Sequence, residues 1–260
     1  MTASARPAEL RRATLEGVAV VIKRWPDAPA DYYAAEAAGL AALGAAGALR
    51  VPRVLKLERE RLVLEDLGES APDAGFWRRA GTGLARLHAV RGERFGFAHD
   101  GYCGPSPQPN TPMDDGWRFF AECRLLPQMR RARDCGRLGA AEGRAIERLC
   151  ARLPERIPPQ PPVLLHGDLW RGNLHCCGDG APALIDAGAA HFGWAEAELA
   201  MLTLFGAPPP AFWRAYAELA APAPDWRERA PLYNLYHLLN HLNLFGGGYL
   251  GAVRAALAGS

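Results

Sequence analysis

The sequence predicts an α+β protein of two lobes: a small N-terminal β-sheet lobe with one helix, residues 1–67, and a larger, mainly helical C-terminal lobe, residues 68–260. Two observations support this division. Apolar and β-branched runs of strand length fall before residue 67, and apolar residues at helical spacing dominate after it. The polar stretch GESAPDAG (68–75) separates the two patterns, and 260 residues suffice for two modest cores.

The first lobe is expected to hold four strands and one helix. The run GVAVVIKRW (17–25) predicts a strand, and the segment before it is expected to pair with it through a turn at Glu16-Gly17. Residues 31–49 are rich in Ala and Leu and predict a helix, with Asp31 as its N-cap. Residues 51–67 predict two more strands joined by a tight turn.

The second lobe is expected to be mostly helical. Apolar residues recur at helical spacing in three stretches, at 76–90, 116–138 and 140–153. The Pro-rich segment PERIPPQPP (154–162) then breaks the pattern. Residues 177–183 predict the turn of a small hairpin that leads into a short strand at 183–186. The remainder is helical, with breaks at Pro and Gly.

Composition narrows the classes of partner. The formal net charge is only +2, which favours neither nucleic acid nor an anionic membrane as partner. No apolar segment follows the N-terminus, and the weakly charged stretch 199–213 is broken by three prolines, so we expect a cytoplasmic protein without a membrane span. The six cysteines form no C-x-x-C pair, so we expect reduced structural thiols rather than a zinc site.

One ordered set of residues points to phosphoryl transfer. Lys23 ends a predicted strand, Glu36 lies on the next helix, and the loop LLHGDLWRGN carries Asp168 and Asn173, followed by Asp186 after a short strand. In such a set a lysine neutralises phosphates, a helix carboxylate holds it, one Asp orients the attacking hydroxyl, and Asn and a second Asp bind Mg²⁺. Singly, each residue is as well explained as a solvated charge or a turn cap. The order and the D-x-x-x-x-N spacing are much harder to obtain by accident.

The loop LLHGDLWRGN resembles the catalytic loop of fructosamine kinases (ketosamine 3-kinases), which lie within the aminoglycoside phosphotransferase-like group of the protein-kinase-like fold. Trp170, directly after Asp168-Leu169, is typical of that family rather than of the wider group. The likeness spans about residues 18–250 and includes four further segments, at 95–110, 117–129, 196–206 and 232–249.

The resemblance implies an enzyme that uses ATP and Mg²⁺ to phosphorylate the sugar 3-hydroxyl of a ketosamine, the Amadori product on an amine or a protein lysine, as a deglycation repair step. It implies Asp168 as the catalytic base, with Asn173 and Asp186 as Mg²⁺ ligands. It also implies that the Lys23–Glu36 pair binds the phosphates of ATP and that backbone groups of Glu65, Asp66 and Leu67 bind adenine. Trp170 is expected to face the sugar. Glu198 is expected to support the catalytic loop or to contact the substrate.

Two other functions are kept as alternatives: a kinase of another small hydroxyl compound, such as an aminoglycoside or amino alcohol, and a nucleotide-binding pseudokinase. Asp186-Ala187-Gly188 matches the wider phosphotransferase group, whereas ketosamine kinases are expected to have Asp-Pro-Ala. The first lobe is expected to be shortened at its start, since no glycine precedes Gly17 and only Ser4 and backbone amides are offered to cover the phosphates. We therefore expect weakened ATP binding. His237 and His241 are expected to hydrogen-bond inside the lobe rather than bind a metal.

Overall fold

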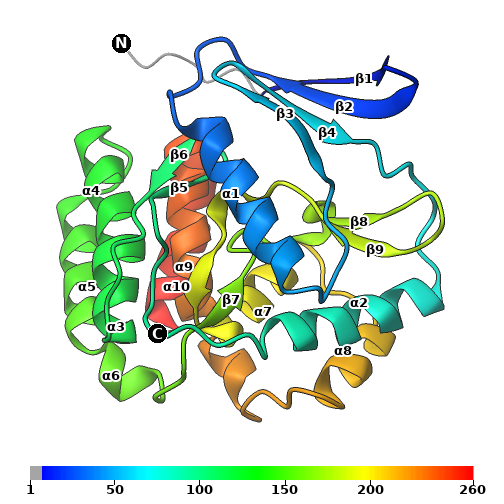
Figure 1. Cartoon of the computed structure of the whole chain (residues 1–260). Coiled ribbons are helices and arrows are strands. Elements are labelled where there is room, and N and C mark those ends of the chain that lie inside the picture. The colour runs from blue at the N-terminus through cyan, green and yellow to red at the C-terminus, as the bar shows by residue number, and fades with distance from the viewer. Residues whose placement is uncertain (1–7, 260) are drawn as a thin grey trace.

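The N-terminal lobe is a four-stranded antiparallel sheet in the order β1-β2-β4-β3 with one helix against it, in a computed structural model that describes residues 8–259 (Figure 1). Its elements are β1 (Glu9–Leu15), β2 (Val18–Arg24), α1 (Tyr32–Ala45), β3 (Val54–Glu58) and β4 (Arg61–Glu65). The predicted fold class of this lobe is confirmed. The expected phosphate cover around Ser4 lies outside the described residues.

Local details of this lobe agree with the predictions in part. The turn between β1 and β2 is confirmed, since Glu16 and Gly17 have positive φ angles, 51° and 80°, as a two-residue hairpin turn requires. Helix α1 stops at Ala45, before the expected residue 49, and the chain enters the left-handed region at Gly47. Asp31 occupies the predicted N-cap position, but its carboxylate makes no cap bond and instead accepts from the Tyr102 hydroxyl at 2.6 Å.

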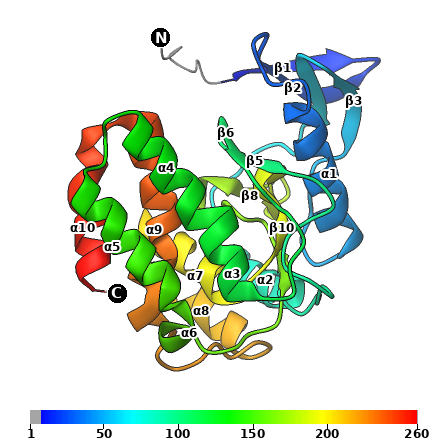
Figure 2. The ribbon, with the colours of Figure 1, turned by 90° about the vertical axis from the view of Figure 1, so that its left-hand side faces the viewer.

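The C-terminal lobe is mainly helical, as predicted. Its helices are α2 (Ala74–Leu87), α3 (Gly116–Phe120), α4 (Leu126–Asp134), α5 (Ala140–Ala151), α6 (Leu153–Arg156), α7 (Ala195–Leu204), α8 (Pro210–Ala217), α9 (Trp226–Phe245) and α10 (Leu250–Ala258). A π-helical turn, η1 (Ala121–Leu125), joins α3 to α4, so the stretch predicted as one helix is interrupted. Figure 2 shows α4, α5, α9 and α10 gathered on the side away from the sheet.

Three short antiparallel ladders lie in this helical lobe and carry the loops of interest. They pair β5 (Gly101–Cys103) with β6 (Ser106–Gln108), β7 (Val163–Leu165) with β10 (His191–Gly193), and β8 (Leu174–Cys176) with β9 (Pro182–Leu184). The 3₁₀ turns η2 (Arg171–Asn173) and η3 (Ala187–Ala189) follow β7 and β9, and η4 (Gly247–Tyr249) joins α9 to α10. The predicted hairpin before residue 186 is confirmed as β8–β9.

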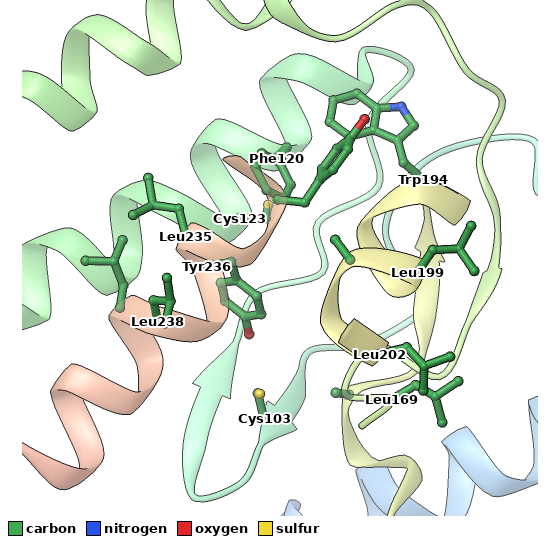
Figure 3. Packing of buried hydrophobic residues seen from close by; sticks show 14 of the residues in the cluster. Cys103, Phe120, Cys123, Leu169, Trp194, Leu199, Leu202, Leu235, Tyr236 and Leu238 are labelled. Atoms are coloured by element: carbon green, nitrogen blue, oxygen red, sulfur yellow. The ribbon is translucent and has the colours of Figure 1, made fainter. Parts of the chain in front are cut away.

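The loop after β7 is anchored in the main hydrophobic core. Leu169 is 1% exposed and belongs to the same core as Leu199 and Leu202 of α7 and Tyr236 of α9. Figure 3 shows Leu169 and Cys103 at the lower end of this core, below Tyr236. Burying a leucine side chain stabilises a fold by about 1.5–3 kcal/mol, so this side chain fixes the loop that carries Asp168.

Among the described residues, no helix has the length and apolar character that crossing a membrane requires.

Candidate active site

The loop from His166 to Asn173 is held from below by a glycine and a buried carboxylate. Gly167 has φ +84°, and a Cβ placed there would lie 2.0 Å from the Ala189 carbonyl oxygen, so only glycine fits. The Gly167 N–H donates to Glu198 Oε1 at 2.7 Å. The backbone just before Asp168 is therefore positioned by α7 and by η3.

His166 braces the same loop. Its Nε2 lies 2.7 Å from the Ile185 carbonyl oxygen, and its Nδ1 accepts the Asp168 N–H at 3.3 Å, which assigns the proton to Nε2. Burial lowers the pKa of this fully enclosed imidazole, so the ring is neutral near pH 7. These contacts make His166 a structural support of the loop.

Glu198 lies beneath the loop that carries Asp168 and contacts its backbone. Its side chain has no exposed surface, and its Oε2 lies 3.0 Å from His88 Nε2 while its Oε1 accepts from Gly167. His88 in turn contacts the Tyr216 hydroxyl at 2.8 Å. Of the two roles expected for Glu198, the position of the carboxylate beneath the loop favours support of the loop over a substrate contact. Support of the catalytic loop is the role its contacts describe.

Asp168 combines partial exposure with a strongly shifted pKa. Its side chain is 22% exposed, and burial raises its pKa to about 7, with a smaller contribution from the charge of Glu198. A carboxylate with a pKa near the working pH can accept a proton from a hydroxyl and release it again. Asn173 Nδ2 donates to the Asp168 carbonyl oxygen at 2.8 Å, which ties the two ends of the loop together.

Lys23 and Glu36 form the predicted ion pair. Lys23 Nζ lies 2.6 and 2.8 Å from the two Glu36 carboxylate oxygens, and both residues are buried. Lys23 Nζ also donates to Asp186 Oδ1. One ammonium group therefore joins β2, α1 and the segment after β9, although 163 positions of sequence separate Lys23 from Asp186.

Close packing of α1 against the turn after β9 brings Asp186 next to Lys23. Asp186 has φ 61° and ψ 53°, a left-handed conformation that aims its carboxylate away from the strand direction. A Cβ on Gly39 of α1 would lie 1.9 Å from the Ala187 carbonyl oxygen. A glycine in α1 thus lets the helix that carries Glu36 touch the turn that carries Asp186.

A cleft of about 450 Å³ opens beside this cluster, between the sheet and the β8–β9 hairpin. Its lining includes Lys23, Glu36, Leu64, Leu67, Ile185 and Asp186. Of the three residues whose backbone is expected to hold adenine, Glu65 and Asp66 already donate their N–H groups within the lobe, to the Arg53 carbonyl oxygen at 2.9 Å and to the Ala19 carbonyl oxygen at 3.1 Å. Leu67 accepts from Gly178 N–H at 3.0 Å, but its own N–H has no partner among the described residues. That N–H is a free donor at the cleft wall.

The oxygen donors near the cleft fit a hard divalent cation. Asn173 donates through its amide nitrogen, and its amide oxygen accepts no bond within residues 8–259. The Asp186 side chain is 48% exposed. Carboxylate and amide oxygens with room left for water and phosphate oxygens are what Mg²⁺ requires.

Trp170 lies folded back over its own loop. A Cβ on Gly172 would lie 2.4 Å from the indole, so the absence of a side chain there makes room for the ring. The indole meets the Phe205 ring edge to face at 6.4 Å and remains 41% exposed. One aromatic ring close to Asp168 is thus available to a ligand.

Two residues beside Asp168 were not predicted. His237 Nδ1 lies 3.7 Å from Asp168 Oδ1, and the Cys103 Sγ lies 3.9 Å from His237 Nδ1. The sequence signals neither contact, because Cys103 and His237 are 134 positions apart and meet only through the packing of β5 on α9. Cys103 and Asp168 are therefore spatial partners of His237 that lie far from it in the sequence.

Comparisons with known proteins agree with this geometry. The sequence model of the family described as "Fructosamine kinase" matches residues 11–259. The chain is 40% identical over 223 residues to a "probable ketoamine kinase" of Synechocystis sp., covering 84% of this chain and 74% of the relative. It is 39% identical to another "probable ketoamine kinase", from Thermus thermophilus, covering 92% of this chain and 87% of the relative.

Solved structures give the same result. A crystal structure titled "putative fructosamine-3-kinase", from Thermobifida fusca, superposes with a TM-score of 0.91 at 38% identity, covering 98% of this chain and 90% of that chain. An aminoglycoside phosphotransferase in complex with gentamicin superposes with a TM-score of 0.61 at 12% identity, a likeness of fold alone. The chain therefore belongs to the fructosamine kinase family and is an ATP-dependent phosphotransferase of the two-lobed, aminoglycoside phosphotransferase-like fold.

Proposed function

We propose that this kinase transfers the γ-phosphoryl group of ATP to the sugar 3-hydroxyl of a ketosamine, a fructosamine or ribulosamine adduct of an amine or a protein lysine, and so takes part in deglycation. The observation that carries the proposal is the pairing, on one loop, of a carboxylate whose pKa lies at about 7 with a partly exposed indole. The flat face of an indole packs well against the C–H face of a sugar.

The nucleotide is proposed to occupy the cleft beside Lys23. The free N–H of Leu67 would donate to adenine, and Lys23, held by Glu36, would neutralise the non-transferred phosphates. Asn173 and Asp186 would hold Mg²⁺, which supplies charge neutralisation of the phosphate oxygens when bound. The Lys23–Asp186 contact keeps the two groups together before the nucleotide arrives.

Asp168 is proposed as the base. As the 3-hydroxyl oxygen forms its bond to the γ-phosphorus, the bond from that phosphorus to the β–γ bridging oxygen breaks and ADP leaves. The hydroxyl proton passes to the Asp168 carboxylate. Gly167, His166 and Glu198 contribute by fixing the backbone of Asp168, because a displacement of about 1 Å at a reacting group can cost about 10²-fold in rate.

A second candidate is a kinase of a different small hydroxyl compound, and Asp186-Ala187-Gly188 favours it because that turn has the pattern of the wider phosphotransferase group. A coupled ADP-release assay with synthetic fructosamine, ribulosamine, an aminoglycoside and an amino alcohol separates the two. We expect turnover with the ketosamines, loss of it in Asp168→Asn, and retention in Asp114→Asn, whose side chain is 85% exposed. Turnover of the aminoglycoside alone would refute the ketosamine proposal, and equal rates in Asp168→Asn would refute the role of Asp168.

A further inference from the structure

Three side chains with different donor atoms meet at the catalytic loop. Cys103 ends β5, Asp168 lies on the loop and His237 lies on α9, and one ligand atom from each lies within 4.8 Å of the other two. Across residues 8–259 this is the one group of three or more such residues with that property. Cys103 and His237 are buried, and Asp168 forms the open side of the group.

We propose that Cys103, Asp168 and His237 form a binding site for Zn²⁺, and that the bound ion inhibits the kinase by occupying the carboxylate that accepts the substrate proton. Sulfur, imidazole nitrogen and carboxylate oxygen are the donors from which protein zinc sites are built. Hard cations such as Mg²⁺ use oxygen donors instead, so the ion that this group selects differs from the one expected at Asn173 and Asp186.

The observed separations are close to those that a tetrahedral ion needs. Bond lengths of about 2.3 Å to sulfur, 2.05 Å to nitrogen and 2.1 Å to oxygen give donor separations of about 3.6 Å between sulfur and nitrogen and about 3.4 Å between nitrogen and oxygen. The corresponding distances are 3.9 Å from Cys103 Sγ to His237 Nδ1 and 3.7 Å from His237 Nδ1 to Asp168 Oδ1. Contractions of about 0.3 Å bring these two separations to the tetrahedral values, and the third pair of donor atoms, on Cys103 and Asp168, lies within 4.8 Å.

The protonation states and neighbours of the donors also fit. Burial lowers the pKa of His237 to about 3, so its imidazole is neutral and has a lone pair to offer. Burial raises the pKa of the Cys103 thiol, so the ion must displace the thiol proton, which leaves to the solvent. Asn240 Nδ2 lies 3.3 Å from Cys103 Sγ and would donate to the thiolate that forms.

The exposure of Asp168 and the number of protein ligands determine how a bound Zn²⁺ ion would affect the kinase reaction. The 22% exposed Asp168 side chain is the route of entry, and three protein ligands leave a fourth coordination position free for water. An Asp168 carboxylate bound to the ion is no longer a base for the 3-hydroxyl. The inhibition rests on the function proposed above, whereas the binding of the ion does not.

Cobalt is the direct probe of the site, because Co²⁺ replaces Zn²⁺ and a thiolate ligand gives it a near-ultraviolet charge-transfer band. We expect the full-length protein, prepared free of metal, to develop this band and tetrahedral visible bands with one equivalent of Co²⁺, and to lose them on addition of Zn²⁺. The Cys103→Ser and Cys103→Ala variants should lack the band, and Cys135→Ser, at an exposed thiol, should keep it. A wild-type spectrum without a thiolate band would overturn the proposal.

Activity measurements test the consequence separately. With Mg²⁺ in large excess, micromolar Zn²⁺ should inhibit turnover reversibly, and a chelator should restore it. Each variant is compared with its own metal-free rate, and Cys103→Ser should raise the half-inhibiting Zn²⁺ concentration by about 10-fold or more. Equal inhibition of wild type and Cys103→Ser would contradict the proposal and place the ion elsewhere. If no acceptor is turned over at all, the function proposed above fails, and the cobalt spectra still decide the site.

Discussion

Replacement of Glu198 tests how the catalytic loop is held. In Glu198→Ala the Gly167 N–H and the His88 Nε2 both lose their partner inside the protein, and each buried polar group left unpaired costs about 1–3 kcal/mol. The two losses together predict a decrease of about 4 kcal/mol in the free energy of unfolding. Glu198→Gln keeps the volume and one acceptor oxygen for Gly167, and its NH2 group can donate to His88 Nε2 once the imidazole proton moves to Nδ1, so we expect a smaller loss of about 1–2 kcal/mol.

The kinetic effect follows from the same contacts. With Gly167 released, Asp168 loses its fixed position, and we expect kcat to fall by about 10²-fold while KM for ATP changes little. Urea unfolding and steady-state kinetics measure the two effects, with Glu155→Ala, a surface partner of Arg152, as a control expected within about 0.5 kcal/mol of wild type. Stability equal to that control, or a rise confined to KM for the ketosamine, would refute the reasoning and return Glu198 to the substrate.

Four further outcomes follow from the site. Because the raised pKa of Asp168 leaves its basic form present only above about 7, kcat/KM should fall tenfold per pH unit as the pH drops below about 7, and a rate constant down to pH 5 would contradict this. Lys23→Met should lower kcat/KM for ATP by about 10²-fold or more in the coupled assay, a loss that a solvated lysine would not cause. Trp170→Leu should raise KM for the ketosamine about 2- to 10-fold and leave KM for ATP unchanged, whereas equal changes in both would argue against a sugar contact. Gly167→Ala should lower stability by more than about 2 kcal/mol in urea unfolding, since both its φ angle and the Ala189 oxygen exclude a Cβ.

Residues whose role in phosphoryl transfer restricts their type and order could be predicted from the sequence. Lys23, Glu36 and Asp186 could be placed in one cluster from sequence because phosphoryl transfer restricts residue type and order along the chain. The sheet of the first lobe could be predicted because its strands are long enough to display a pattern. The three-residue strands β5, β7 and β10 could not, because so few residues define no period.

Features that depend on contacts between distant segments could not be predicted from the sequence. Asp31 occupies the expected cap position, but Tyr102 from a distant strand takes its carboxylate. Two roles were expected for Glu198, and only the packing of α7 beneath the loop favours support of the loop over a substrate contact. Cys103 and His237 carry no local signal of their nearness to Asp168, which exists only because β5 and α9 converge on the loop.

Phosphorus–proton correlation NMR of the product formed from ATP and a synthetic fructosamine tests whether Asp168 directs phosphorylation to the sugar 3-hydroxyl of a ketosamine. We expect a cross-peak from the phosphorus to the proton on C3 with the wild-type enzyme, and no product with Asp168→Asn. A cross-peak to another position, or the same product from Asp168→Asn at the wild-type rate, would contradict it.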